Sequence, residues 1–237
     1  MRSLLFILTF CSAAMIVTGQ NLVPNAGFDQ NNGCPKHSGQ ISLANFWFSP
    51  NNTTPDYFND CSTSFDFGTE FNTKGGQVPH SGKAYAGIQV FNMNHNEYYE
   101  YLESRLDSPL TVNQQYCIRA WVSLGQSKYA LEEFGAVFSV NEIKSPSPQK
   151  MKLPYTILRG QNPLSDADRW MCIQGIYTAK GGERFLTFGD FSTYDNFRSL
   201  QIDSSQDTLF KSTYYFIDDL AVEPVFTPGS CTCPPDK

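Results

Sequence analysis

Short runs in which apolar and polar residues alternate recur along this 237-residue chain, with turn-forming residues between them. In residues 115–124 the alternation places Cys117, Arg119, Trp121 and Ser123 on one side of the run. Successive side chains of a strand point to opposite faces, so a period of two is typical of a half-buried strand. Helical periodicity is scarce. The pattern therefore predicts an all-β chain, folded as a two-sheet antiparallel β-sandwich with long loops.

Two of the other runs need an argument. Residues 97–106 could form a short helix, but their place before Pro109 and a Gln-rich turn favours a strand that leads into a hairpin. Residues 180–183, with Gly181 and Gly182, separate two alternating runs. A Gly-Gly pair between such runs is a hairpin signal, so we expect the strands on either side to pair.

Residues 29–81 are rich in Asn, Gly, Pro, Ser and Thr and carry many aromatic residues. A loop region of this length inside a compact domain is usually functional or tied down covalently, and its aromatic content argues against disorder. Cys34 and Cys61 flank much of it, so we predict that they form a disulfide. Closing a loop of that length stabilises the fold by roughly 3–4 kcal/mol in the chain-entropy model.

Four more cysteines follow. Cys117 and Cys172 each lie in an apolar strand, where they could bridge paired strands or remain small buried thiols. Cys231 and Cys233 form a Cys-Thr-Cys in a Pro-rich tail. A ring that tight is strained, which makes pairing with another cysteine or a partner at least as reasonable. The spacings do not match a zinc ribbon or finger.

The N-terminus reads as a secretory signal over residues 1–19. Arg2 supplies the positive region, an apolar core follows, and small residues end at Gly19. Cys11 is a poor lipidation site because the bulky Phe10 precedes it. We therefore expect an exported chain with a sandwich domain at residues 20–225, a Cys/Pro-rich tail at residues 226–237, and no transmembrane segment after cleavage.

Charge narrows the choice of partner. The chain has 17 basic and 23 acidic residues, a net charge of −6, and no basic run. Nucleic acid is therefore excluded as a partner class, while neutral ligands, cations and proteins fit.

Two neighbouring carboxylates, Asp218 and Asp219, interrupt an aromatic, β-branched run at residues 214–222. One of them must face inward on a regular strand, and a buried carboxylate needs a cation or several donors. If the first and last strands pair, Asp29 would join them around a structural Ca²⁺ ion. The alternative is that the two acids mark a bulge and hydrogen-bond a neighbouring loop.

The chain also resembles a known group of proteins. The end segments NLVPNAGFD (residues 21–29) and YYFIDDLAV (214–222) resemble the terminal strands of galactose-binding-like jelly-roll modules, which include many carbohydrate-binding modules. Four inner segments resemble one family of Bacteroidota surface proteins: ISLANFWFSPNNTTPDYFNDC (41–61), VPHSGKAYAGI (78–88), NEYYEYLESRLDSPLTVNQQYCIRAWVSL (96–124) and YTAKGGERFLTFGDF (177–191). The resemblance implies a jelly-roll β-sandwich on the outer surface of a Gram-negative bacterium. It also implies that the Lys83 carbonyl joins the metal shell.

The resemblance implies carbohydrate as the ligand. Tyr98, Tyr99, Tyr101 and Trp47 are the aromatic residues that could stack on sugar rings, although packing inside the protein is the better explanation for each of them taken alone. The competing hypothesis is a structural or interaction subunit of an outer-membrane or cell-surface protein complex. A shallow aromatic groove would favour the glycan, and a broad apolar patch would favour a protein partner.

Catalytic signals are missing from the sequence. The three histidines, His37, His80 and His95, lie in polar, loop-like contexts without a metal-binding spacing, and no GxSxG elbow occurs. Glu97, Glu100 and Glu103 could hold a glycosidase pair, but acids on a strand are usually solvated. We therefore predict no catalytic residues and a non-catalytic binding module.

Overall fold

A computed structural model describes residues 19–92, 98–193, 199–202 and 212–235. Residues 1–18 of the predicted signal, Cys11 among them, and also His95 and Glu97, lie outside this part. The described chain is all-β apart from one 3₁₀ turn. Its elements are η1 (Ile41–Leu43), β1 (Trp47–Phe48), β2 (Asp56–Asn59), β3 (Ala84–Asn92), β4 (Leu102–Arg105), β5 (Gln115–Leu124), β6 (Tyr129–Leu131), β7 (Glu133–Ser139), β8 (Thr156–Arg159), β9 (Met171–Thr178), β10 (Phe185–Gly189), β11 (Ser199–Gln201) and β12 (Ser212–Pro224).

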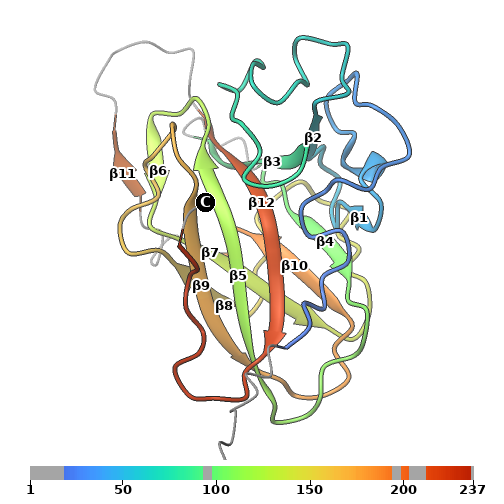
Figure 1. Cartoon of the computed structure of the whole chain (residues 1–237), viewed down its shortest axis with the longest axis vertical. Helices are drawn as coiled ribbons and strands as arrows, with labels where there is room; N and C mark the ends of the chain where they lie inside the picture. Colours follow the sequence, from blue (N-terminus) through green and yellow to red (C-terminus); the bar gives the residue numbers. More distant parts are fainter. Residues whose placement is uncertain (1–18, 93–97, 194–198, 203–211, 236–237) are drawn as a thin grey trace, which may run out of the picture.

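Ten strands form one curled antiparallel sheet in the order β1-β4-β10-β7-β8-β9-β5-β12-β3-β2, and β11 pairs with β6. The sheet folds at the β8–β9 boundary, where one residue pair, Arg159 with Gln174, joins the two halves. In Figure 1 the half with β5 and β12 faces the viewer and β7, β8 and β10 lie behind it. The predicted antiparallel β-sandwich of jelly-roll type is therefore confirmed.

The main core lies between the two halves and follows the alternation in the sequence. Along β5, Ile118, Ala120 and Val122 belong to this core, whereas Cys117 and Arg119 point to the outer face. Residues 102–105, within the run that a helix could also have explained, are strand β4, but the predicted hairpin is wrong, because β4 pairs with β1 and β10 and not with the following strand β5. The period-two pattern correctly gave the side to which each β5 residue points, because successive side chains of a strand point to opposite faces; most of β5 is nevertheless buried on both faces.

The predicted hairpin around Gly181 and Gly182 is wrong. Strand β9 pairs with β5 and β8, whereas β10 pairs with β4 and β7, so the turn crosses from one half of the sheet to the other. Both glycines have positive φ, as the sequence suggested. The turn is closed by the carboxylate of Glu183, which accepts hydrogen bonds from the backbone N–H of Lys180 and Gly181. Local turn chemistry therefore fixed the bend but not the strand partners.

The first residues of the described chain lie beside the last strand, as expected. The backbone N–H of Leu22 donates to Val222 O at 2.9 Å, and the Asn21 side chain bonds both Val222 N and Leu220 O. Residues 20–24 are held by these bonds without forming a regular strand.

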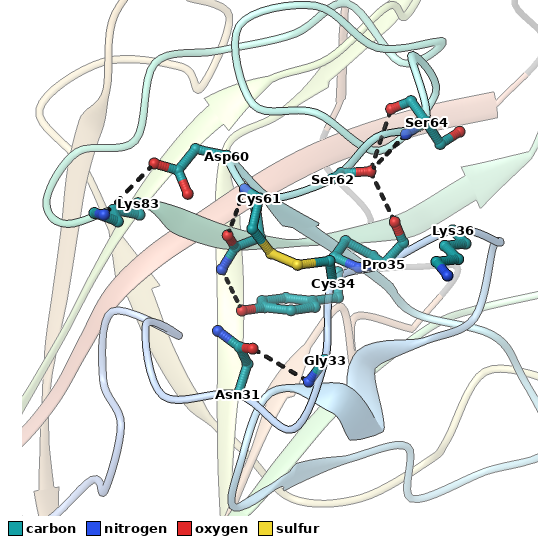
Figure 2. The surroundings of a disulfide bond; sticks show 12 residues. Asn31, Gly33, Cys34, Pro35, Lys36, Asp60, Cys61, Ser62, Ser64 and Lys83 are labelled. Carbon is teal, nitrogen blue, oxygen red and sulfur yellow. Dashed lines mark hydrogen bonds and ion pairs between the residues drawn. A yellow bond between two sulfur atoms is a disulfide. The ribbon is translucent and has the colours of Figure 1, made fainter.

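All six cysteines from residue 34 onward are paired. Cys34–Cys61 is bridged as predicted, with a Cα–Cα distance of 5.5 Å. Figure 2 shows Ser62 beside this bridge, with its Oγ donating to Pro35 O. The side chain of Asn59 accepts a hydrogen bond from Cys61 N. The loop-rich region is thus tied down covalently and by hydrogen bonds.

The bridge between Cys117 and Cys172 that the sequence allowed is wrong. Cys117 pairs with Cys231 and Cys172 pairs with Cys233, so both tail cysteines are bonded to the sandwich. Although β5 and β9 are neighbours, Cys172 lies opposite Trp121 and Cys117 lies opposite Ile176. Three disulfides indicate an oxidising compartment. In the described part of the chain, no helix is long and apolar enough to cross a membrane.

Candidate functional site

Two of the four predicted stacking residues are inside the protein. Trp47 is 2% exposed, packs on Phe28, and donates its indole N–H to Asn25 O. Tyr101 is fully buried, and its hydroxyl donates to Asp190 O and accepts from Met151 N. Neither ring is available to a ligand, so the packing explanation holds for both.

The other two candidates, Tyr98 and Tyr99, are partly buried. The hydroxyl of Tyr98 accepts from Thr54 N and lies 2.7 Å from Thr54 Oγ1. The ring of Tyr99 lies 4.6 Å below the Lys150 ammonium. Both tyrosines thus join loops to the sandwich, and they lie apart from the cleft described below.

The predicted acids do converge, and they converge on the loop at residues 80–83. Asp218 is fully buried and accepts hydrogen bonds from the backbone N–H of His80, Ser81 and Asp219. Asp219 bonds the His80 ring and the Ser81 hydroxyl. Asp29 accepts from Lys83 N at 2.6 Å. The strand register shifts after Asp218, so the acids mark a bulge and hold a loop, which was the alternative to a metal site.

This arrangement bears on the calcium prediction. Each of the three carboxylates already accepts hydrogen bonds, and the Lys83 carbonyl accepts one from Asp60 N. Among the described residues, no group of three or more His, Cys, Asp or Glu side chains is placed to hold a metal ion. Burial, followed by the nearby Asp219, raises the pKa of Asp218 well above its usual value. Calcium binding at these residues stays a prediction.

A cleft of about 590 Å³ lies on a different part of the surface, at the fold between β8 and β9. Two regions far apart in the sequence line it: residues within 159–174, with Cys172 and Gln174 on the outward side of β9, and the tail residues Thr232 and Cys233. Its volume is in the range of small-molecule sites. None of the four predicted stacking residues lines it.

Buried contacts hold the first of these regions in place. Leu164 is fully buried in the main core, and its carbonyl accepts the hydroxyl of Tyr215, which also accepts from Leu131 N. Further along, Asp166 Oδ1 accepts from the N–H groups of Asp168 and Arg169. The loop is therefore anchored by its core residue and its acidic turn, while Gln161 and Asn162 remain exposed.

Trp170 is the aromatic residue of this cleft. Its indole N–H donates to Val78 O at 2.7 Å, and its ring contacts His80 and Tyr85 edge to face. These contacts fix the plane of a ring that is only partly buried and lines the cleft. A rigid, preoriented aromatic surface costs little conformational entropy on binding.

Polar groups surround Trp170. Arg159 and Arg169 each pair with a carboxylate, of Glu133 and Asp166, yet their side chains are 59% and 79% exposed and so keep donors accessible. The Oε1 atom of Gln174 is buried and accepts no hydrogen bond from any described residue. A buried acceptor without a donor costs about 1–3 kcal/mol.

The residues that line the cleft are poorly suited to acid–base catalysis. Asp166 is the one carboxylate among the described residues that line the cleft. Partial burial acts to raise its pKa, but hydrogen bonds from the Asp168 and Arg169 N–H groups and the Arg169 guanidinium lower the pKa overall. An ionised carboxylate that already accepts several hydrogen bonds is unsuited as a general acid. Glycoside hydrolysis also needs a pair of carboxyl groups.

Sequence reasoning missed this cleft. Trp170, Arg159 and Arg169 were not among the residues that the sequence analysis singled out. A possible signal was the cluster of polar and turn-forming residues between Arg159 and Trp170, directly before a strand that carries a cysteine. The path of the tail, which completes the cleft, depends on disulfide pairing and has no local signal.

The comparisons with known proteins assign this chain to no family. No family model matches the chain, and no curated protein matches it. The CBM22-1 xylan-binding domain of Paenibacillus barcinonensis Xyn10C is 11% identical, with a TM-score of 0.44 over 87% of this chain and 96% of that one. TmCBM61, solved with β-1,4-galactotriose, is 10% identical, with a TM-score of 0.40 over 87% and 99%. A cyclase from Fischerella sp. TAU is 12% identical, with a TM-score of 0.39 over 89% and 100%. At these values no ligand or activity carries over to this chain.

Proposed function

We propose that this chain is a non-catalytic, exported glycan-binding module that holds its ligand in the cleft between β8 and β9. The observation that carries the proposal is the combination, in one cleft, of an oriented Trp170 with the planar polar groups of Arg169 and Gln174. A sugar presents an apolar face and a rim of hydroxyls, so it can stack on the indole while its hydroxyls bond the rim.

The character of the cleft supports a neutral glycan over an ionic ligand. Both arginines are already paired with carboxylates, so the cleft offers directed hydrogen-bond donors without a strong excess of charge. Its rim also includes Gln161, Asn162 and Ser165, which can donate and accept. Function on the outer surface of a member of the Bacteroidota, as the sequence resemblance implies, belongs to the same proposal.

The test is binding of the oxidised protein to a panel of soluble polysaccharides, with xylans, galactans and glucans included, by affinity electrophoresis. Titration calorimetry with matching oligosaccharides then gives Kd. We expect Trp170→Ala to weaken binding at least tenfold. Because Trp170 also packs on Tyr85, the variant Gln161→Ala/Asn162→Ala provides a second test at two exposed positions.

The matched control is Tyr98→Ala/Tyr99→Ala, which alters the partly exposed tyrosines favoured by the sequence and leaves the cleft unchanged. Loss of binding in this control and not in the cleft variants would move the site to those tyrosines. If the wild-type protein binds no polysaccharide at millimolar concentration but co-purifies with a surface complex, the interaction-subunit hypothesis replaces the glycan.

A further inference from the structure

The C-terminal tail is held to the sandwich chiefly by its two disulfides. The last ladder bond joins Val225 N to Gln115 O, and residues 226–230 are exposed. Beyond that point the described tail has one backbone hydrogen bond, within its own turn from Ser230 N to Thr227 O. The dark-red trace in Figure 1 leaves the end of β12, turns back, and runs up beside β9 to the C-terminal end. Little burial accompanies this path, so noncovalent contacts hold the tail weakly.

The two bridges add nothing that β5 and β9 need for their own pairing. These strands pair over eight consecutive residues without a register shift, from Gln115 with Thr178 to Val122 with Met171. What the bridges do is carry the tail across β9. Cys231 is bonded to Cys117 of β5, and its Sγ lies 3.6 Å from Gly175 O of β9. Cys233 is bonded to Cys172, further along the same strand.

The segment 231–233 therefore crosses β9 beside Gln174, the residue whose side-chain oxygen is buried without a donor. Thr232 and Cys233 line the same cleft as Gln174, opposite the anchored loop at residues 159–166. The cleft thus has one wall held by the core and one wall held by disulfides.

We infer that the tail is a redox-dependent wall of the cleft, so that ligand binding requires the Cys117–Cys231 and Cys172–Cys233 disulfides. This inference rests on the proposed function for its ligand. An external dithiol would open the wall by thiol–disulfide exchange. Each protein disulfide takes up two electrons and two protons and becomes two thiols, while one dithiol is oxidised to its own disulfide.

Loss of the wall has two physical effects. The released tail gains conformational freedom, which a ligand would have to remove again before the wall could contact it. Thr232 and Cys233 also leave the cleft, so the ligand loses the contacts that this wall provides. We expect binding to be at least tenfold weaker without the bridges.

The experiment compares two sets of variants in the full-length exported protein. Cys117→Ser/Cys172→Ser/Cys231→Ser/Cys233→Ser removes both tail bridges and leaves no free thiol. Cys34→Ser/Cys61→Ser is the matched control, because it removes a disulfide far from the cleft. Kd for the best oligosaccharide is measured for each, and circular dichroism confirms that each is folded. Hydrogen exchange of residues 172–176 without ligand reports on the wall itself.

The control variant also provides a route that needs no change in the tail. In Cys34→Ser/Cys61→Ser only the tail bridges remain. Titration with dithiothreitol should therefore abolish ligand binding over the same concentration range in which four thiols appear. This arm keeps the inference testable if the fourfold serine variant does not fold.

The inference is supported if the fourfold variant binds at least tenfold more weakly, the control binds normally, and exchange at residues 172–176 rises. Equal binding by the fourfold variant and the wild-type protein would overturn the inference and leave the proposed function intact. If the oxidised wild-type protein binds no glycan, the proposed function fails. In that case, unchanged hydrogen exchange at residues 172–176 after loss of the bridges would also contradict the inference that the tail forms a wall of the cleft.

Discussion

Replacing Glu100 by glutamine should remove much of the dependence of stability on pH. Glu100 is almost completely buried, accepts a hydrogen bond from Gln89 N at 2.7 Å, and lies close to the Thr54 hydroxyl. Burial, and after it the neighbouring carboxylate of Asp56, raises the pKa of Glu100 from 4.5 to about 8. The folded protein therefore carries a neutral carboxyl here at pH 7, whereas the unfolded chain carries a carboxylate.

The sign follows from proton binding. Between the unfolded and folded pKa values the folded state binds more protons, so the free energy of unfolding falls as pH rises. This stabilisation is complete below about pH 4.5 and is lost as pH rises through about 8. A shift of this size corresponds to about 5 kcal/mol at most, a large fraction of the stability of a typical domain. Glu103, whose pKa burial raises to about 7, acts in the same direction.

Glutamine keeps the oxygen that accepts from Gln89 N and adds an uncharged N–H₂ group that can donate to Thr54 Oγ1. We expect Glu100→Gln to match the wild-type protein near pH 5 and to exceed its stability by up to a few kcal/mol near pH 9. Urea denaturation at steps from pH 5 to 9 measures this, with Glu132→Gln, an exposed position, as the matched control. Parallel pH profiles for Glu100→Gln and the wild-type protein would refute a neutral buried carboxyl.

Two further outcomes are expected. Cys34→Ser/Cys61→Ser should lower the free energy of unfolding by roughly 3–4 kcal/mol, because the bridge spans a sequence separation of 27 residues. Urea denaturation measures this loss. Non-reducing peptide mapping that finds both cysteines free in the exported wild-type protein would contradict the bridge. If Asp29, the Lys83 carbonyl and Asp218 or Asp219 bind calcium, a chelator should lower Tm and added calcium should restore it; identical melting curves in both conditions would remove calcium from this protein.

The sandwich was predictable because a strand that buries one face carries its own signal. In β5, Ile118, Ala120 and Val122 face the main core while Cys117 and Arg119 face outward, and no contact with distant residues is needed to recognise this alternation. The Gly-Gly turn failed as a guide for the opposite reason. A bend depends on the local residues, but the partner of the following strand depends on the whole sheet, and β10 found its partners in β4 and β7.

Disulfide partners were equally beyond local reasoning. Cys117 and Cys172 lie on adjacent strands and look like a pair, yet the register places each of them opposite another residue. A displacement of a few residues along a strand is enough to separate two Cα atoms beyond bridging distance. The tail then supplies both partners, because its two cysteines can reach two anchor points on neighbouring strands.

Two of the aromatic candidates are buried, and the cleft was not predicted from the sequence, for the same reason. Alternation predicts which side of a strand a residue faces, but it does not predict what lies on that side. Tyr101, directly before β4, points away from the main core and is nevertheless fully buried, because Met151 and Phe191 pack against it. Trp170 packs against the buried aromatic cluster that includes Tyr85 and Phe216, yet it lines a cleft together with the tail residues Thr232 and Cys233. Whether an outward aromatic becomes core or binding surface is therefore decided by the loops and disulfides that cross the sheet. The tail bridges are accordingly the place where a small covalent change should have the largest effect on binding.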